Sequence, residues 1–114
     1  MSVEISANRK ALRDFHILER FEAGLELKGT EVKSIRAGHA NLQGAFARVE
    51  NMQVYLYEMD VRAYEKASHT QHEPKSRRRL LLHKQQIGKL FEQTHIKGNS
   101  LVALRLYWKG HRVK

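Results

Sequence analysis

The residues of this chain best suited to chemistry form a run of cations at 75–84, KSRRRLLLHK. The run contains five cations and no acid: Lys75, Arg77, Arg78, Arg79 and Lys84. Such a cluster suits a polyanion, because each phosphate that it neutralises releases counterions from a nucleic acid. Few small substrates need that much charge. The structural alternative is a solvent-exposed helix start whose charges bind nothing.

Charge elsewhere in the chain favours the nucleic-acid interpretation. The 21 Lys and Arg residues exceed the 12 Asp and Glu residues, which leaves a formal charge of +9 on 114 residues. Two further basic groups lie near the two ends of the sequence: Arg9, Lys10 and Arg13, and Arg105, Lys109, Arg112 and Lys114. Composition therefore predicts a folded nucleic-acid-binding protein.

RNA is favoured over DNA as the partner. The sequence shows no helix-turn-helix signature, and exposed aromatic and basic residues on a small β protein suit unpaired bases better than a major groove. Tyr107, beside Arg105, is a candidate to stack on a base or ribose. Its neighbour Trp108 lies on the opposite strand face and is expected in the core.

Candidate catalytic and metal-binding groups are sparse. His69 and His72 lack a third ligand nearby and are expected to be exposed loop residues rather than a metal site. Glu31, Asp60 and His83 could serve a metal-dependent nuclease, but their spacing does not require it. There is no Cys for a disulfide, a thiolate zinc site or a thiol nucleophile, which fits a reducing cytoplasm. We predict a binding protein, not an enzyme, without metal or cofactor.

No apolar run approaches the length of a signal peptide or a bilayer-spanning helix, so a soluble cytoplasmic protein is expected. Residues 1–11 show no apolar period and predict a flexible N-terminal arm, which leaves one domain over residues 12–114. In the first half of that domain, alternating apolar residues predict a β-hairpin over 15–27. A short helix over 30–36, capped by Thr30 and ended at Gly38, is expected to follow.

The second half of the domain is expected to hold a second hairpin, a loop, the main helix and a last strand. The corresponding ranges are 46–50 with 53–59, then 68–76, 78–93 and 102–108. Together these elements predict a mainly β protein with short helices, an OB-fold-like closed β-barrel with about three flanking helices. The strand pattern still continues at Lys114, so a truncated chain is expected.

Specific strings carry a resemblance to a known family. They are NRKA at 8–11, FEAG at 21–24, GTEVKSIRAG at 29–38, NL at 41–42, RLLLHK at 79–84, and LYWKG at 106–110 with RVK at 112–114. From Asn8 to Lys114 the chain resembles the small protein B (SmpB) family, the bacterial partners of transfer-messenger RNA (tmRNA, or SsrA RNA).

This resemblance implies an OB-type barrel that binds the tRNA-like domain of tmRNA and makes no bond itself. The complex would enter stalled ribosomes for rescue and peptide tagging, the process called trans-translation. The family's basic C-terminal tail, which enters the decoding region of the small subunit, is not in this sequence. The chain is therefore expected to bind RNA as a monomer in the cytoplasm, but not to support tagging. The alternative is a general OB-fold RNA-binding or ribosome-associated protein.

The resemblance and the basic clusters together predict a set of RNA-binding residues. They are Asn8, Arg9, Lys10, Glu22, Lys33, Ser34, Arg36, Arg77, Arg78, Arg79, Leu81, His83, Lys84 and Tyr107. The cations suit phosphate, whereas Asn8 and His83 offer hydrogen bonds to base edges or a 2′-hydroxyl. Glu22 either accepts a hydrogen bond from RNA or orients a neighbouring cation. Leu81 packs either under a base or in the core.

Overall fold

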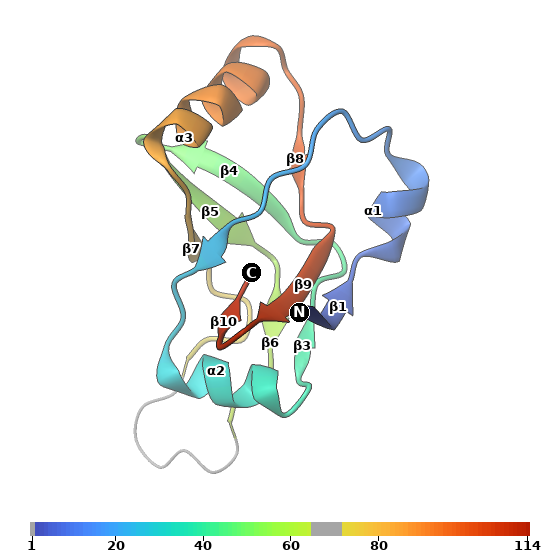
Figure 1. Ribbon diagram of the computed structural model, residues 1–114, viewed down its shortest axis with the longest axis vertical. Coiled ribbons are helices and arrows are strands. Elements are labelled where there is room, and N and C mark those ends of the chain that lie inside the picture. Colours follow the sequence, from blue (N-terminus) through green and yellow to red (C-terminus); the bar gives the residue numbers. More distant parts are fainter. Residues whose placement is uncertain (1, 65–71) are drawn as a thin grey trace.

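The protein is described by a computed structural model in which residues 2–64 and 72–114 are placed (Figure 1). Its largest sheet has five antiparallel strands in the order β2-β7-β5-β4-β8. The strands are β2 (Gly24–Leu25), β7 (Arg78–Leu81), β5 (Gln53–Tyr57), β4 (Phe46–Glu50) and β8 (Leu101–Val102). The predicted second hairpin is confirmed as β4 and β5, joined at Asn51 and Met52, whose φ angles of 51° and 59° suit a tight two-residue turn.

A second, three-stranded sheet joins the two ends of the sequence. Strand β9 (Arg105–Lys109) pairs with β1 (Ser2–Ala7) on one side and with β10 (Arg112–Val113) on the other. The predicted strand over 102–108 is confirmed only from Arg105, as β9 with its turn at Gly110, because Val102 belongs to the separate strand β8 of the five-stranded sheet. The expected flexible arm over residues 1–11 was wrong for residues 2–7, because β9 offers this segment a backbone partner about one hundred residues away that no local period reveals.

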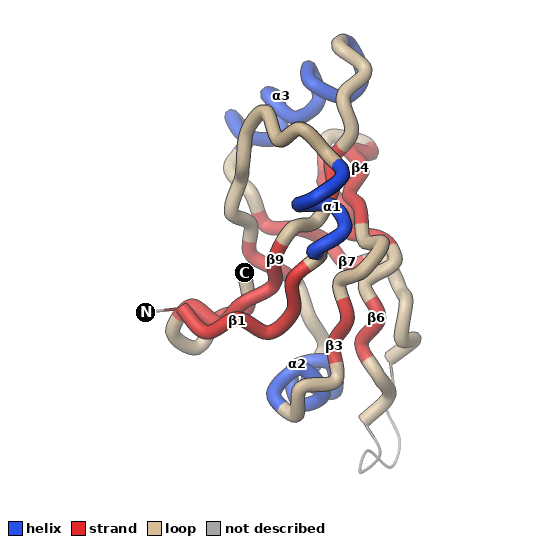
Figure 2. The backbone as a smooth tube through the Cα atoms, turned by 90° about the vertical axis from the view of Figure 1, so that its right-hand side faces the viewer, coloured by secondary structure: helices blue, strands red, loops and turns tan. Residues whose placement is uncertain are grey.

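The strands do not form the closed barrel that was expected. A third sheet contains only β3 (Ala40–Asn41) and β6 (Asp60–Val61), and the described strands form three separate ladders. Strand β3 contacts β1, and β10 contacts β2, so the sheets adjoin without a continuous ladder of backbone hydrogen bonds. The described part of the chain thus has a mixed-β architecture with three α-helices (Figure 2).

The inner faces of the two larger sheets meet in one core. Leu56 of β5 packs in the same buried cluster as Leu106 of β9 and Val113 of β10. Trp108 packs against this cluster, as predicted. Because side chains alternate along a strand, the residues between these ones face outward, and the outward faces of the two sheets point in different directions.

The helices differ in part from their predicted positions. Helix α2 (Gly29–Arg36) confirms the short helix, but the Glu31 carboxylate accepts from the Lys28 backbone N–H at 2.8 Å, so Lys28 and not Thr30 is the N-cap. Helix α1 (Arg9–Asp14), which follows β1 directly, was not predicted.

The predicted main helix over 78–93 was wrong at its start. Residues 78–81 form β7, and helix α3 (Lys84–Phe91) begins after His83, followed by a π-helical turn, η1 (Glu92–Ile96). A three-leucine run satisfies helical and strand periods alike, and pairing of Leu80 with Val54 decides for the strand.

The first predicted hairpin was also wrong. Only Gly24–Leu25 is a strand, and residues 15–23 form an irregular segment beside the sheets. Its contacts are made by side chains, since Phe21 packs near α3 and Glu19 pairs with Lys89 at 2.7 Å. An alternating pattern without a neighbouring strand edge cannot form a ladder.

Candidate RNA-binding surface

The outward side of β9 gathers cations around one tyrosine. Arg105, Tyr107 and Lys109 alternate along the strand and so share a face. Arg112 lies opposite Lys109, and Lys114 exchanges both backbone hydrogen bonds with Tyr107 at 2.9 and 3.0 Å, which puts these two on the same side. We refer to Arg105, Tyr107, Lys109, Arg112 and Lys114 as the β9 face.

Glu22 organises the centre of the β9 face. Its carboxylate accepts a hydrogen bond from the Tyr107 hydroxyl and one from Lys109 Nζ at 3.1 Å. The Tyr107 hydrogen bond, with Lys109 beside it, lowers the pKa of Glu22, and the same hydrogen bond raises the pKa of Tyr107. Of the two roles weighed for Glu22, the structure shows the second: it orients a cation and a ring.

The β9 face stays positive and is hollowed. Its four cations outnumber the two carboxylates that contact it, Glu22 and Glu4, the latter 3.2 Å from Arg105. Ser2, Glu22, Arg105, Tyr107 and Lys109 line an open hollow of about 390 Å³. Exposed ion pairs contribute only about 0–1 kcal/mol each, so a phosphate can compete for these cations.

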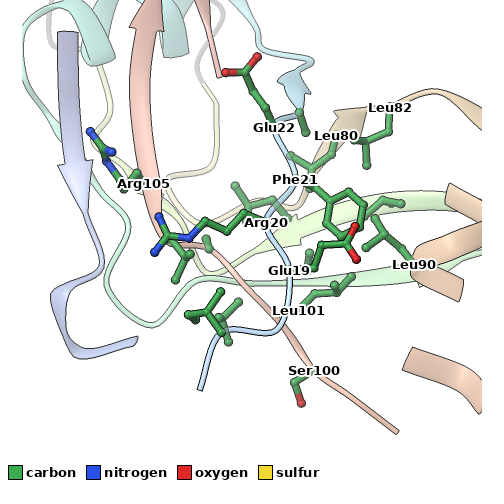
Figure 3. A pocket seen from close by; sticks show the side chains of 18 of the residues that line it. Glu19, Arg20, Phe21, Glu22, Leu80, Leu82, Leu90, Ser100, Leu101 and Arg105 are labelled. Carbon is green, nitrogen blue, oxygen red and sulfur yellow. The ribbon is translucent and has the colours of Figure 1, made fainter. Parts of the chain in front are cut away.

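A larger groove adjoins this hollow. It has a volume of about 960 Å³ and lies between residues 15–25 and the β8–β9 region. In Figure 3 the Phe21 ring points toward Leu90, whereas Arg20 and Arg105 lie together at the other end. The groove is therefore apolar at one end and basic where it approaches the β9 face.

Leu81 lies at the edge of this region, near Glu22. It pairs with Gly24, where an added Cβ would lie 3.2 Å from the Leu81 Cβ, so glycine permits the close approach of β2 to β7. The Leu81 side chain is 46% exposed, which excludes the core alternative. His83 and Lys84 follow as residues that are not buried, at the start of α3.

Asn8 is buried next to the start of β9 and does not line the surface. The residue is buried; its Oδ1 accepts from the Ala11 N–H at 3.2 Å and its own N–H donates to the Leu104 carbonyl at 2.8 Å. The expected contact between Asn8 and a base edge does not fit this burial. Asn8 instead caps α1 beside the start of β9, and leaves Arg9 and Lys10 exposed on that helix.

Arg78 is a structural residue, which corrects the predicted phosphate cluster. Its side chain is only 2% exposed, pairs with Glu31 and donates to the carbonyls of Met59 and Pro74 at 2.6 and 2.9 Å. Strand alternation explains why Arg78 is buried and Arg79 is not: Arg78 faces inward, while Arg79 lies outward opposite Tyr55.

Helix α2 lies on another side of the molecule. Arg36 is 5.7 Å from the ring of Trp108, which faces away from Tyr107, and Lys33 is 5.6 Å from the ring of Tyr64. Ser34 is fully buried, so the RNA contact predicted for its side chain does not fit the structure. A helix must bury one stripe, and Ser34 belongs to that stripe beside Ile35.

The predicted cations therefore do not form one continuous surface. Helix α1, helix α2 and strand β7 lie on different sides of the molecule in Figure 1. The structure brings together Glu22 and Tyr107, and Leu81 pairs with Gly24, two residues after Glu22. The four cations of the β9 face were seen in the sequence only as a basic group, although the i, i+2 spacing of Arg105, Tyr107 and Lys109 already predicted a shared face.

The described residues do not bring together the candidate metal ligands or the candidate nuclease residues. His72 is 4% exposed, not a surface residue as expected; its Nδ1 lies 2.8 Å from the Thr30 hydroxyl and its Nε2 2.9 Å from the Val61 carbonyl. His69 lies outside the described residues. Glu31 lies on α2, where it pairs with Arg78. His83 lies at the start of α3, and α2 and α3 are at opposite ends of the molecule (Figure 1).

Residues 2–64 and 72–114 hold neither a metal-binding cluster nor a membrane-spanning helix. No group of three or more His, Asp or Glu side chains in these ranges is placed to hold a metal ion. No helix in this part of the chain has the length and apolarity needed to cross a membrane.

Fold and surface together define a small mixed-β protein whose basic face suits a polyanion. The SmpB protein family model matches residues 5–114. The SsrA-binding protein of Carboxydothermus hydrogenoformans is 54% identical over 110 residues, which cover 96% of this chain and 74% of the relative. That of Pelotomaculum thermopropionicum is 51% identical, with 96% and 72% covered.

A solved structure gives the same result. A chain from a structure titled "tmRNA-SmpB: a journey to the center of the bacterial ribosome" is 41% identical to this one, with a TM-score of 0.73. The similarity covers 94% of this chain and 78% of that one. The chain belongs to the SmpB family.

Proposed function

We propose that this protein binds the tRNA-like domain of tmRNA and helps to deliver it to stalled ribosomes in trans-translation. The observation that carries the proposal is the β9 face, in which Glu22 holds Tyr107 and Lys109 in place among further cations. Its relatives are named SsrA-binding proteins, and the similar solved chain comes from a structure whose title names tmRNA-SmpB.

In this proposal the β9 face takes the phosphates and the adjoining edge takes a sugar or base. Lys109, Arg112 and Arg105 supply the charge, and the flank of Tyr107 offers a surface for stacking. Leu81, exposed and paired with Gly24 two residues after Glu22, supplies an apolar contact beside Glu22. Arg9 and Lys10 on α1 extend the basic surface past the start of β9.

The proposal is one of binding, not catalysis, by a monomer in the cytoplasm with neither metal nor cofactor. The adjoining edges of the three sheets make an OB-like barrel the closest description of the fold, left open between the ladders. The predicted single domain from residue 12 now includes β1, because β1 completes the sheet that carries the site.

The test is filter binding of the tRNA-like domain at several salt concentrations, with an elongator tRNA as competitor. The double variant Lys109→Ala/Arg112→Ala should bind more weakly and reduce the log–log salt slope by about 0.7 to 0.9 for each phosphate that the variant no longer neutralises. The matched control is Lys97→Ala, which removes an exposed cation just after η1, at another part of the molecule.

A wild-type affinity that is equal for the two RNAs would contradict recognition of tmRNA and favour a general RNA-binding protein. An unchanged salt slope in the double variant would remove the β9 face from the site.

A further inference from the structure

The outward face of the five-stranded sheet carries arginines whose guanidinium groups lie over aromatic rings. Alternation along paired strands places Phe46, Arg48, Tyr55 and Tyr57 on this side, opposite the buried Val49, Val54 and Leu56. Arg77 and Arg79 of the neighbouring chain segment join them. We refer to Phe46, Arg48, Tyr55, Tyr57, Arg77 and Arg79 as the β4–β5–β7 face.

The rings hold the guanidinium groups in position. Phe46 and Tyr57 stack with their centroids 5.5 Å apart, and the Arg48 guanidinium lies 5.4 and 5.7 Å from the two rings. The Arg77 guanidinium lies 4.1 Å from the Tyr55 ring. A guanidinium that rests on a ring loses less conformational entropy on binding, and its other side stays free for a ligand.

This face is open to solvent. Arg48 and Arg77 are exposed. The helices pack elsewhere: α3 covers Val49 and Val54 on the inner side, and α2 contacts β6. Because the inner sides of the two larger sheets share one core, the β4–β5–β7 face points in a different direction from the β9 face.

The charges favour an anionic partner with flat groups. Arg77 pairs with Glu50 at 3.6 Å and Arg79 with Glu26 at 2.9 Å, both at positions where a phosphate can compete. Within residues 2–64 and 72–114 no carboxylate lies at ion-pairing distance from Arg48. Planar cations and rings together match unpaired nucleotides, whose bases stack on guanidinium planes and aromatic rings while their phosphates accept hydrogen bonds.

We propose that the β4–β5–β7 face is a second RNA-binding surface, which takes unpaired nucleotides by stacking on Arg48 and Arg77. This surface is separate from the one assigned to the tRNA-like domain, and it does not depend on that assignment. A protein with both surfaces can hold two RNA segments at once, on different sides.

The experiment measures two RNAs against two variants. One probe is a fluorescent single-stranded oligouridylate of about 12 nucleotides, within the site sizes of sheet-based binders, and the other is the tRNA-like domain. Arg48→Gln/Arg77→Gln should weaken oligouridylate binding about 5- to 100-fold, the effect of losing one stacked base, and leave the tRNA-like domain nearly unchanged. Lys109→Ala/Arg112→Ala should show the opposite pattern.

Three results would overturn the second surface: no oligouridylate binding by the wild type, an unchanged affinity in Arg48→Gln/Arg77→Gln, or an equal loss in both double variants. A protein partner on this face would give the first of these. The variant Arg48→Lys/Arg77→Lys keeps the charge and removes the planes; full affinity in this variant would overturn the stacking. Loss of tRNA-like domain binding alone would count only against the β9 face.

Discussion

The two outward sheet faces of this protein organise their cations by partly different means. On the β9 face a carboxylate, Glu22, holds Lys109 and the Tyr107 hydroxyl by hydrogen bonds. On the β4–β5–β7 face Glu50 likewise accepts a hydrogen bond from the Tyr57 hydroxyl and pairs with Arg77, but the guanidinium groups of Arg48 and Arg77 also lie over aromatic rings. The Lys109 ammonium of the first face suits phosphates as a point charge, whereas the ring-supported guanidinium planes of the second can also stack on bases. The same strand alternation thus builds two surfaces of different selectivity.

One buried ion pair joins strand β7 to helix α2, and breaking it should have the largest effect. Arg78→Ala leaves the buried Glu31 carboxylate without its partner, so we expect a decrease of about 3–5 kcal/mol in the free energy of unfolding, measured by urea denaturation. Arg77→Ala, one residue away but exposed, should change it by less than about 0.5 kcal/mol. Equal decreases in the free energy of unfolding of the two variants would contradict the assignment of Arg78 as a structural residue and Arg77 as a surface residue.

The two carboxylates that contact the faces should differ in their effect on RNA. Glu22→Gln weakens the hold on Lys109, so affinity for the tRNA-like domain should fall about 2- to 5-fold in a filter-binding titration, the size of an exposed charge contact. Glu50→Gln, the matched change on the β4–β5–β7 face, should leave that affinity unchanged. A gain in affinity from Glu22→Gln would mean that this carboxylate only repels phosphate.

The smallest expected effect is a shift in the pKa values of Glu22 and Tyr107. The folded pKa of Glu22 is lowered, so the stability from its contacts is present above the unfolded pKa and is lost as the pH falls through the folded value. The folded pKa of Tyr107 is raised, so the stability from its hydroxyl is present below the unfolded pKa and is lost as the pH rises through the folded value.

The Tyr107 phenol should therefore ionise at a higher pH than a free tyrosine, and Glu22→Gln should remove most of that shift. Ultraviolet titration of wild type and variant, with Tyr107→Phe to identify the signal, measures it. Identical Tyr107 midpoints in wild type and Glu22→Gln would contradict the hydrogen bond.

Local sequence signals predicted elements whose partners lie close in the chain. The hairpin of β4 and β5 and the helix over Gly29–Arg36 were found from alternation, turn residues and a helix stop. Segments without a clear period of their own were missed or misassigned, because local periodicity carries no information about a distant partner. Residues 2–7 became a strand only through β9, and residues 15–23 stayed irregular without a neighbouring edge.

The candidate site shows the same division. Glu22, Leu81 and Tyr107 were identified from sequence, and the structure brings Glu22 to Tyr107 by a hydrogen bond across 85 positions. Ser34, Arg78 and Asn8 were predicted to contact RNA, yet all three are buried. A motif selects residues that matter, but it does not distinguish a residue that binds RNA from one that holds such a residue in place.

By itself, the sequence determined the charge, the family and the chemistry available to a polyanion, because these depend on residue identity and order alone. Only the tertiary structure decided which cations face solvent together. Burial is a property of the assembled sheets: of three consecutive arginines, the middle one turns into the core to meet Glu31, and its two neighbours face outward.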